Sequence, residues 1–157
     1  MGYSGRILVA RSSRPLSELA AVKAEVLHES TYNGDWRSAQ LDGDLPGAVA
    51  ALIAETGAQA LSAYILDSDL ADVEASSPKG VDWHVYLHEE TAMSYGAPEL
   101  PQTADAVVEL AGAWSAEAGL PFDPVAFRAA LEGHNTFAED TFRELLEGLG
   151  ISTKPSE

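Results

Sequence analysis

The chain has 157 residues, no cysteine and a net charge of −16 at pH 7, from 25 acidic and 9 basic residues. Without cysteine, it cannot form disulfides, use a catalytic thiol or hold a cysteine-ligated zinc or iron–sulfur centre. A charge of this sign repels nucleic acid and anionic membranes and attracts basic partners. The apolar run at residues 7–10 is too short for the core of a signal peptide. We therefore expect a cytoplasmic protein that binds neither nucleic acid nor membrane.

The first 90 residues carry mainly the signals of strands. Asn33-Gly34 is the strongest two-residue hairpin signal, and it predicts that the runs on either side pair antiparallel. Residues 60–67 are apolar at both odd and even positions, as in a strand buried on both faces. The next two runs alternate apolar and polar side chains, which is typical of a hairpin with one buried and one solvent-facing side. The predicted strands are residues 5–12, 23–31, 35–41, 60–67, 70–76 and 81–88.

Helix signals interrupt the strands once and then fill the chain from residue 90 onward. Asp44 is expected to cap the first helix and Gly57 to end it. Asp123 precedes a proline and is expected to cap the helix before the last one. Thr136 and Glu139 have the spacing of a capping box at the start of the last helix. The predicted helices lie within residues 42–57, 90–96, 103–119, 123–133 and 135–150.

This order of strands, one helix, strands and then helices predicts an α+β fold. We expect a mainly antiparallel sheet of about five to six strands, with one helix inserted between strands and a C-terminal helical half packed on the sheet. The length is ordinary for one domain. Residues 1–151 are therefore predicted to form a single domain, sheet-rich over 1–90 and helical over 100–151. Residues 152–157 are predicted to be a frayed tail.

Three aspartates, Asp67, Asp69 and Asp72, follow the fourth predicted strand. A strand that ends in Asp-x-Asp resembles the motif of haloacid-dehalogenase-type phosphatases and the metal-binding motif of nucleotide-sugar glycosyltransferases. The first family also needs a downstream lysine and a further acidic pair for magnesium, and here only Lys79 and Lys154 follow. The second family places a nucleotide-binding half before its motif, and only 66 residues precede Asp67 here.

A structural role explains the same three residues. Aspartate and serine at the end of a strand cap free backbone amides and mark a bend or bulge. Three neighbouring carboxylates are also able to bind a calcium-like cation weakly, which stays an alternative.

His84, Tyr86 and His88 alternate with the apolar residues of the last predicted strand and are expected on its solvent-facing side. Residues four apart on a strand stand about 13 Å apart, so the two histidines cannot hold one metal unless the strand is broken between them. A metal site that joins either histidine to His28 of another strand is one alternative. An aromatic and imidazole face that packs on a helix or a partner is the other. His134, between the last two predicted helices, is expected to bond locally to a helix end.

These patterns assemble no catalytic set. The leading hypothesis is a non-catalytic binding protein, without cofactor or metal, whose strongly acidic surface contacts a basic protein partner. The size, acidity, lack of cysteine and α+β layout resemble those of the small immunity proteins that bacteria use against basic toxins. That resemblance implies an immunity or accessory role in a bacterial cytoplasm. The candidate binding residues are Asp67, Asp69, Asp72, His84, Tyr86 and His88, together with Glu139, Asp140, Glu144 and Glu147 of the last helix.

Two other functional hypotheses stay open. The first is a small metal-dependent hydrolase that uses Asp67 and Asp69 with a nearby histidine. The second is a small-ligand-binding homo-oligomer in which a second copy covers the sheet face at Trp83 and Tyr86. The sequence decides neither the oligomeric state nor whether the aspartates bind a divalent cation.

Overall fold

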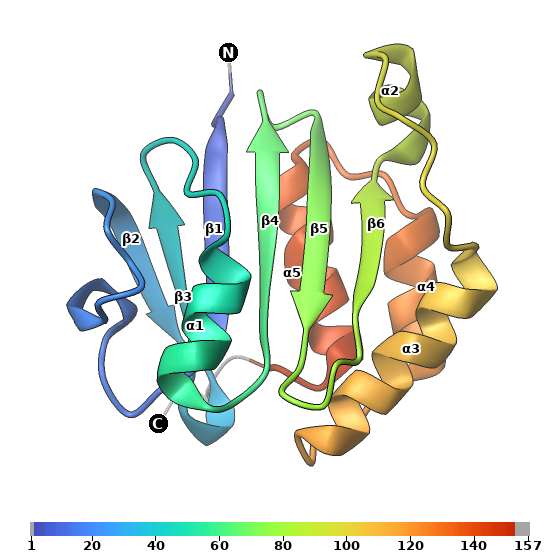
Figure 1. The fold of residues 1–157 in the computed structure, drawn as a ribbon. Coiled ribbons are helices and arrows are strands. Elements are labelled where there is room, and N and C mark those ends of the chain that lie inside the picture. The colour runs from blue at the N-terminus through green and yellow to red at the C-terminus, as the bar shows by residue number, and fades with distance from the viewer. Residues whose placement is uncertain (1, 153–157) are drawn as a thin grey trace, which may run out of the picture.

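The computed structural model describes residues 2–152 and shows a six-stranded sheet in which all neighbouring strands are antiparallel (Figure 1). The strand order is β2-β3-β1-β4-β5-β6, so β1 lies in the middle of the sheet between β3 and β4. The strands are β1 (Gly5–Arg11), β2 (Val26–Thr31), β3 (Trp36–Leu41), β4 (Ala60–Leu66), β5 (Leu70–Ser76) and β6 (Trp83–Leu87). The predicted α+β class is confirmed.

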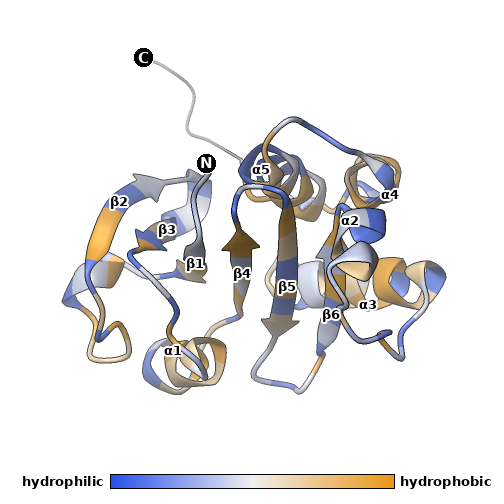
Figure 2. Ribbon diagram, turned by 90° about the horizontal axis from the view of Figure 1, so that it is seen from above, coloured by the Kyte–Doolittle hydropathy of each residue, from blue (hydrophilic) through white to orange (hydrophobic). Residues whose placement is uncertain are grey.

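Helices cover the two faces of the sheet unequally (Figures 1 and 2). The helices are α1 (Ala48–Thr56), α2 (Glu89–Ser94), α3 (Ala104–Glu117), α4 (Pro124–Glu132) and α5 (Ala138–Leu149). α1 lies on one face near β1 and β4, whereas α3, α4 and α5 lie on the other. On the face that carries α1, Ala92 of α2 packs with Leu70 of β5 and Tyr86 of β6. α2 thus covers one end of these two strands on that face.

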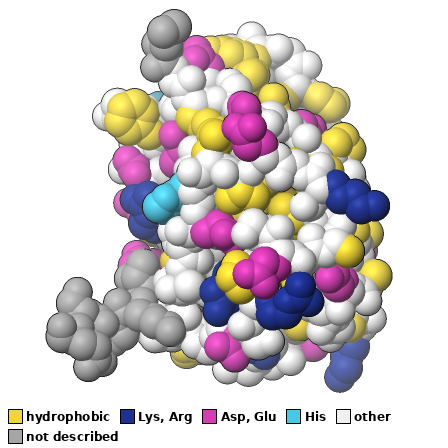
Figure 3. All heavy atoms as spheres, turned by 90° about the vertical axis from the view of Figure 1, so that its left-hand side faces the viewer, with side chains coloured by type: hydrophobic (Ala, Val, Ile, Leu, Met, Phe, Trp, Pro, Cys, Tyr) yellow, Lys and Arg dark blue, Asp and Glu magenta, His cyan; other side chains and the backbone are white. Residues whose placement is uncertain are grey.

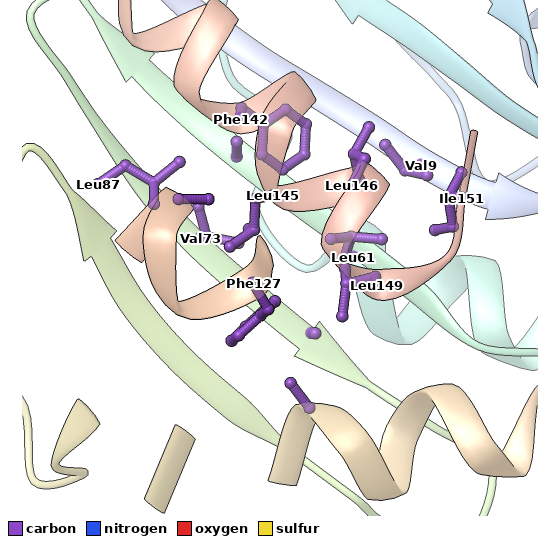
Figure 4. Packing of buried hydrophobic residues seen from close by; sticks show 14 of the residues in the cluster. Val9, Leu61, Val73, Leu87, Phe127, Phe142, Leu145, Leu146, Leu149 and Ile151 are labelled. Carbon is purple, nitrogen blue, oxygen red and sulfur yellow. The ribbon is translucent and has the colours of Figure 1, made fainter. Parts of the chain in front are cut away.

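The larger core lies between the sheet and the three C-terminal helices. Apolar side chains of α5 and of four strands interdigitate there (Figure 4). They are Phe142, Leu145, Leu146 and Leu149 of α5, and Val9, Leu61, Val73 and Leu87 of the sheet. Trp114 of α3 adds an aromatic cluster, with ring centroids 5.7 Å from Trp36 and 6.4 Å from Trp83. Full burial of such side chains stabilises the fold by about 1.5–3 kcal/mol each, so this layer dominates its stability.

Several local predictions are confirmed. β2 and β3 pair as a hairpin, and its turn is one residue longer than the Asn-Gly signal, covering Asn33–Asp35. Gly57 ends α1 in the left-handed conformation, with φ of 71°. Asp123 caps α4 by accepting two backbone N–H bonds at 3.1 Å. These signals depend only on near neighbours in the chain, so contacts with distant parts of the chain do not change them.

The predicted cap at Asp44 is wrong. α1 begins at Ala48 after Gly47, which has φ of 77°, and no side chain caps its first turn. Asp44 instead pairs with Arg6 of β1 and accepts a bond from the backbone N–H of Leu45 at 2.7 Å. The ion pair with Arg6 holds the carboxylate away from the first turn of the helix.

The predicted capping box of Thr136 and Glu139 is also wrong. α5 begins at Ala138 without a side-chain cap, and the Ala138 N–H donates to the carbonyl oxygen of Ser68 at 2.7 Å. Glu139 Oε2 accepts a bond from Ser68 Oγ at 2.9 Å. The turn between β4 and β5 thus provides the partners that a local cap was expected to provide.

The predicted tail lies mostly outside the described residues, which include only Ser152 of it. The carbonyl oxygen of Ser152 accepts a bond from the Asn33 N–H at 3.0 Å. Over residues 2–152, no helix combines the length and the apolar character needed to cross a membrane.

Candidate functional site

The turn between β4 and β5 contains both aspartates of the Asp-x-Asp pattern, Asp67 and Asp69. Asp67 and Ser68 have φ of 53° and 57°, the left-handed region that tight hairpin turns use at their central positions. Asp69 N–H donates to the Leu66 carbonyl oxygen at 2.9 Å and closes the turn. Asp67 Oδ1 accepts a bond from the Gly2 N–H at 2.9 Å. The predicted bend, with an aspartate that caps a backbone amide, is therefore present.

This turn also holds distant segments together. Ser68 Oγ accepts a bond from the Tyr3 N–H at 2.9 Å and donates to Glu139 of α5. The hydroxyl of Tyr95, next to α2, donates to Asp69 Oδ2 at 2.7 Å. Among residues 2–152, no group of three or more His, Asp or Glu side chains is placed to hold a metal ion. The geometry thus gives these carboxylates anchoring roles and offers no support for the hydrolase hypothesis.

Asp72 and His84 meet elsewhere, on the face of the sheet that carries α1, where both side chains are partly exposed. Asp72 Oδ1 and His84 Nε2 are joined by a hydrogen bond, and Glu74 lies opposite His84 in the register of β5 and β6. Ser62 and Tyr64 of β4 lie opposite Glu74 and Asp72. We call this surface the open face, and it consists of Arg6, Ser62, Tyr64, Asp72, Glu74 and His84.

Arg6 is the guanidinium of the open face, and its charge is already matched. Its Nε pairs with Asp44, and its NH1 nitrogen donates to Ser62 Oγ at 2.8 Å and lies 3.8 Å from Glu74 Oε2. The guanidinium carbon lies 5.6 Å from the centre of the Tyr64 ring. The bond from Arg6 lowers the pKa of Asp44, which stays ionised. Arg6 therefore contributes little free positive charge to the surface.

His84 is the second basic group of the open face. Its hydrogen bond to Asp72 raises the pKa of His84 above its usual value, and Glu74 adds to this rise, while partial burial opposes it. The backbone N–H of His84 donates to Gln102 Oε1 at 2.9 Å. Because this amide belongs to an edge strand, the contact blocks the outer edge of β6 from pairing with another strand.

A cavity of about 270 Å³ adjoins the open face at the start of α1. Its lining is Arg6, Gly47, Ala48, Val49, Ala50, Ser62, Glu74, Ala75, Ser76 and Asp82. Glu74 and Asp82 are exposed, and Asp82 accepts a bond from the Ser76 hydroxyl. The lining thus holds two accessible carboxylates and one guanidinium, which Asp44 already pairs. The cavity has the chemistry of a seat for a cationic side chain.

Tyr86 and His88 do not belong to the exposed surface, contrary to the prediction. Tyr86 is 5% exposed, and its hydroxyl donates to the Pro98 carbonyl oxygen at 2.8 Å. His88 is 3% exposed, because β6 ends at Leu87 and His88 takes φ of 58°. This conformation breaks the alternation and brings the ring to Thr141 of α5.

The sheet order excludes two predicted combinations of residues. His28 lies on β2 and His84 on β6, at opposite edges of the sheet, about 24 Å apart at the usual strand spacing. They cannot share a metal. Trp83 and Tyr86 are three residues apart on one strand and therefore face opposite sides. Trp83 packs edge-on against Phe127 at 5.5 Å, beneath α4, so the two do not form one face for a second copy.

The acids of α5 are only partly free. Asp140 pairs with Arg143 at 2.9 Å, and Glu139 is half-buried against the β4–β5 turn. Glu144 and Glu147 are exposed. Because α5 packs on the other side of the sheet, these two glutamates and the open face cannot touch the same small ligand.

Acidic and basic side chains are interspersed on the side of the molecule that contains β2 (Figure 3). Arg14 and Glu18, four residues apart, form an ion pair, with 3.9 Å between Nε of the arginine and Oε1 of the glutamate. A basic partner therefore meets less uncompensated negative charge on this side than on the open face.

No family model, curated protein or solved structure matches this chain. The sequence pointed to Asp72 and His84 but not to Glu74, opposite His84, nor to Arg6 and Asp82, which line the adjoining cavity. Each lies at a polar position of a strand or next to one, but only the strand order shows that they converge.

Proposed function

We propose that this protein is a non-catalytic binding protein whose open face accepts a lysine- or arginine-bearing segment of a basic partner protein. The observation that carries the proposal is a partly exposed strip of sheet with carboxylates along it and a cavity at one end. A role of the immunity or accessory type, in which an acidic protein covers a basic one, fits this arrangement.

The charges of the strip favour a cation. Carboxylates outnumber bases there, and Arg6 and His84 each already pair with one of them. The carboxylates are Asp44, Asp72, Glu74 and Asp82. An arriving ammonium or guanidinium group therefore meets a net negative potential, which speeds association and weakens with salt.

The shape of the strip favours an extended segment. A flat row of side chains on two strands ends in the cavity between α1 and the sheet. We place one long basic side chain of the partner in the cavity, beside Glu74 and Asp82, and the rest of the segment along β5 and β6.

A fluorescent peptide of alternating arginine and glycine provides the first test, measured by anisotropy and by NMR shift mapping. Its analogue with citrulline in place of arginine keeps the shape and removes the charge. We expect the arginine peptide to shift amides of β4, β5 and β6, and to lose affinity in about 0.5 M salt. Equal binding of the citrulline peptide would contradict the proposal.

Two double variants with the same net charge test the location. Asp72→Asn with Glu74→Gln neutralises the open face, and Glu144→Gln with Glu147→Gln neutralises the same number of charges on α5. We expect the first pair to weaken binding about five- to tenfold and the second pair to change it less than twofold. Equal losses would show that net charge, and not the open face, attracts the peptide.

A further inference from the structure

The buried imidazole of His88 joins segments that are distant in sequence. Its Nδ1 lies 2.7 Å from the carbonyl oxygen of Asp69 in the β4–β5 turn, and its Nε2 lies 2.7 Å from Thr141 Oγ1 of α5. The backbone N–H of Asn135, between α4 and α5, points at the same Nε2 at 3.3 Å. His88 is the residue between β6 and α2, which we call the β6–α2 corner. Its ring therefore connects this corner by hydrogen bonds to the β4–β5 turn, to α5 and to the α4–α5 link.

These partners determine which ring nitrogen carries hydrogen. A carbonyl oxygen can only accept, so Nδ1 must donate; a backbone N–H can only donate, so Nε2 must offer its lone pair. Thr141 Oγ1 accepts a bond from Asn135 Nδ2 at 2.9 Å, and its own hydrogen is then free to donate to His88 Nε2. With a neutral ring, Nε2 accepts from Thr141 and from the Asn135 N–H, whose other near acceptor is Thr141 Oγ1 at 3.4 Å.

A second proton on His88 would break this arrangement. It would remove the acceptor that Nε2 offers to the hydroxyl of Thr141, which is fully buried, and leave the Asn135 N–H only its longer contact to Thr141 Oγ1. Donors without acceptors in a buried site are destabilising. The ring of His134 also stacks on His88, with centroids 3.9 Å apart and planes 18° apart, so a positive charge on either ring opposes one on the other.

Charged groups reach the ring from the other segments packed around it. Asp69 of the turn and Glu139 of α5 favour a charged ring, whereas His134 of the α4–α5 link opposes it. Glu89, the next residue, begins α2 and is exposed. Burial is the largest influence, and it lowers the pKa of His88 below its usual value.

We propose that His88 is an acid-sensitive latch that holds the β6–α2 corner and the α4–α5 link against the β4–β5 turn when neutral, and releases them when protonated. His88 has φ of 58°, in the left-handed region that few residues other than glycine adopt, and the bonds of the neutral ring hold the corner in this conformation. This latch does not depend on the proposed partner or on the open face.

Linkage gives the direction of the pH effect. A base whose pKa is lowered in the closed state binds fewer protons there than in the open state. The stability that the neutral ring gives the closed state is therefore fully present above about pH 6.5, the ordinary pKa of histidine. It decreases as the pH falls below that value. If the ring stays neutral in the closed state, a fall to about pH 5.5 multiplies the opening constant about tenfold.

NMR of the ¹⁵N-labelled protein tests the latch directly. Long-range ¹H–¹⁵N spectra at about pH 7.5 should show hydrogen on Nδ1 and none on Nε2 of His88. Amide protection factors of residues 88–95 and 133–141 should fall by up to about tenfold between about pH 7.5 and 5.5, with those of β1 and β4 unchanged. Hydrogen on Nε2 near pH 7.5, or a ring that titrates at or above about pH 6.5, would overturn the proposal.

Two matched variants separate the latch from a general effect of acid. His88→Asn removes the titration and tolerates the left-handed conformation, and His134→Asn makes the same chemical change on the exposed ring. We expect the pH dependence of protection over residues 133–141 to disappear in His88→Asn and to persist in His134→Asn. Persistence in His88→Asn would refute the latch. If that variant does not fold, the ring titration of the unmodified protein decides alone.

Discussion

Gly148 sets how closely α4 and α5 approach, and its replacement by alanine tests the packing of the main core. A Cβ on Gly148 would lie 2.7 Å from both the backbone nitrogen and the Cα of Phe127. Backbone cannot swing aside as a side chain can, so α4 would have to move. The Gly148 carbonyl oxygen also accepts the Asp123 N–H at 2.9 Å, which fixes the start of α4 at this point.

The expected loss follows from two opposing effects. Overpacking a well-packed core costs about 1–3 kcal/mol, and a contact with rigid backbone belongs in the upper part of that range. Alanine in place of glycine within a helix returns up to about 1 kcal/mol. Gly148→Ala should therefore lower the free energy of unfolding by about 2 kcal/mol, which for a chain of this size is roughly 5 °C in Tm.

Gly112 of α3 provides the matched control. A Cβ there would meet only the ring of Phe122, at 3.2 and 3.3 Å, and a ring edge can give way by a few tenths of an ångström. Gly112→Ala should remain within about 0.5 kcal/mol of the unmodified protein, because the helical gain offsets that adjustment. Urea unfolding of both variants measures the difference. A Gly148→Ala protein as stable as Gly112→Ala would refute this account of the α4–α5 contact.

Three further predictions concern the turn, the open face and the net charge. Ser68→Ala should cost about 1–3 kcal/mol in urea unfolding, because the Tyr3 N–H and the half-buried carboxylate of Glu139 each lose a partner; a loss below 0.5 kcal/mol, roughly the scatter of surface mutations, would contradict this. The raised pKa of His84 stabilises the folded state fully below about pH 6.5, and this advantage disappears as the pH rises through the raised value. The stability difference between the unmodified protein and His84→Gln should therefore shrink with rising pH, and a constant difference would contradict it. Salt at about 0.5 M should raise Tm at neutral pH by screening a net charge of −16, and an unchanged Tm would show that repulsion is not significant.

The fold was predictable where burial acts on one strand or helix at a time. Ala71, Val73 and Ala75 are buried and alternate with more exposed neighbours, as the period of two indicated. The two failed caps, at Asp44 and Thr136, had sound local signals. They failed because the carboxylates involved have distant partners. Asp44 pairs with Arg6, 38 residues away, and Glu139 of the predicted capping box accepts from Ser68, 71 residues away. No local pattern reports such competition.

The candidate site was predictable in part. Asp72 and His84 lie on one face of a hairpin that the sequence predicts correctly, and their contact follows from that pairing. The prediction for His88 was wrong because the alternation of apolar and polar residues in β6 continues through position 88. That position is not glycine or asparagine, the usual signals of a left-handed conformation. Only its buried partners in α5 and the β4–β5 turn explain why the strand stops one residue earlier.

The distribution of charge along the chain misled the search for the acidic surface more than any single residue did. Residues 81–157 hold 14 acidic and 3 basic residues, which pointed to the last helix. Yet the open face takes its carboxylates, Asp72 and Glu74, from the less acidic half, and of the two carboxylates beside it only Asp82 comes from the other half. Opposite layers of a fold lie about 10 Å apart, and physiological salt screens charges over about 8 Å. Glu144 and Glu147 on the far layer therefore add little to the potential at the open face, and a surface assembled by strand pairing decides where a cation binds.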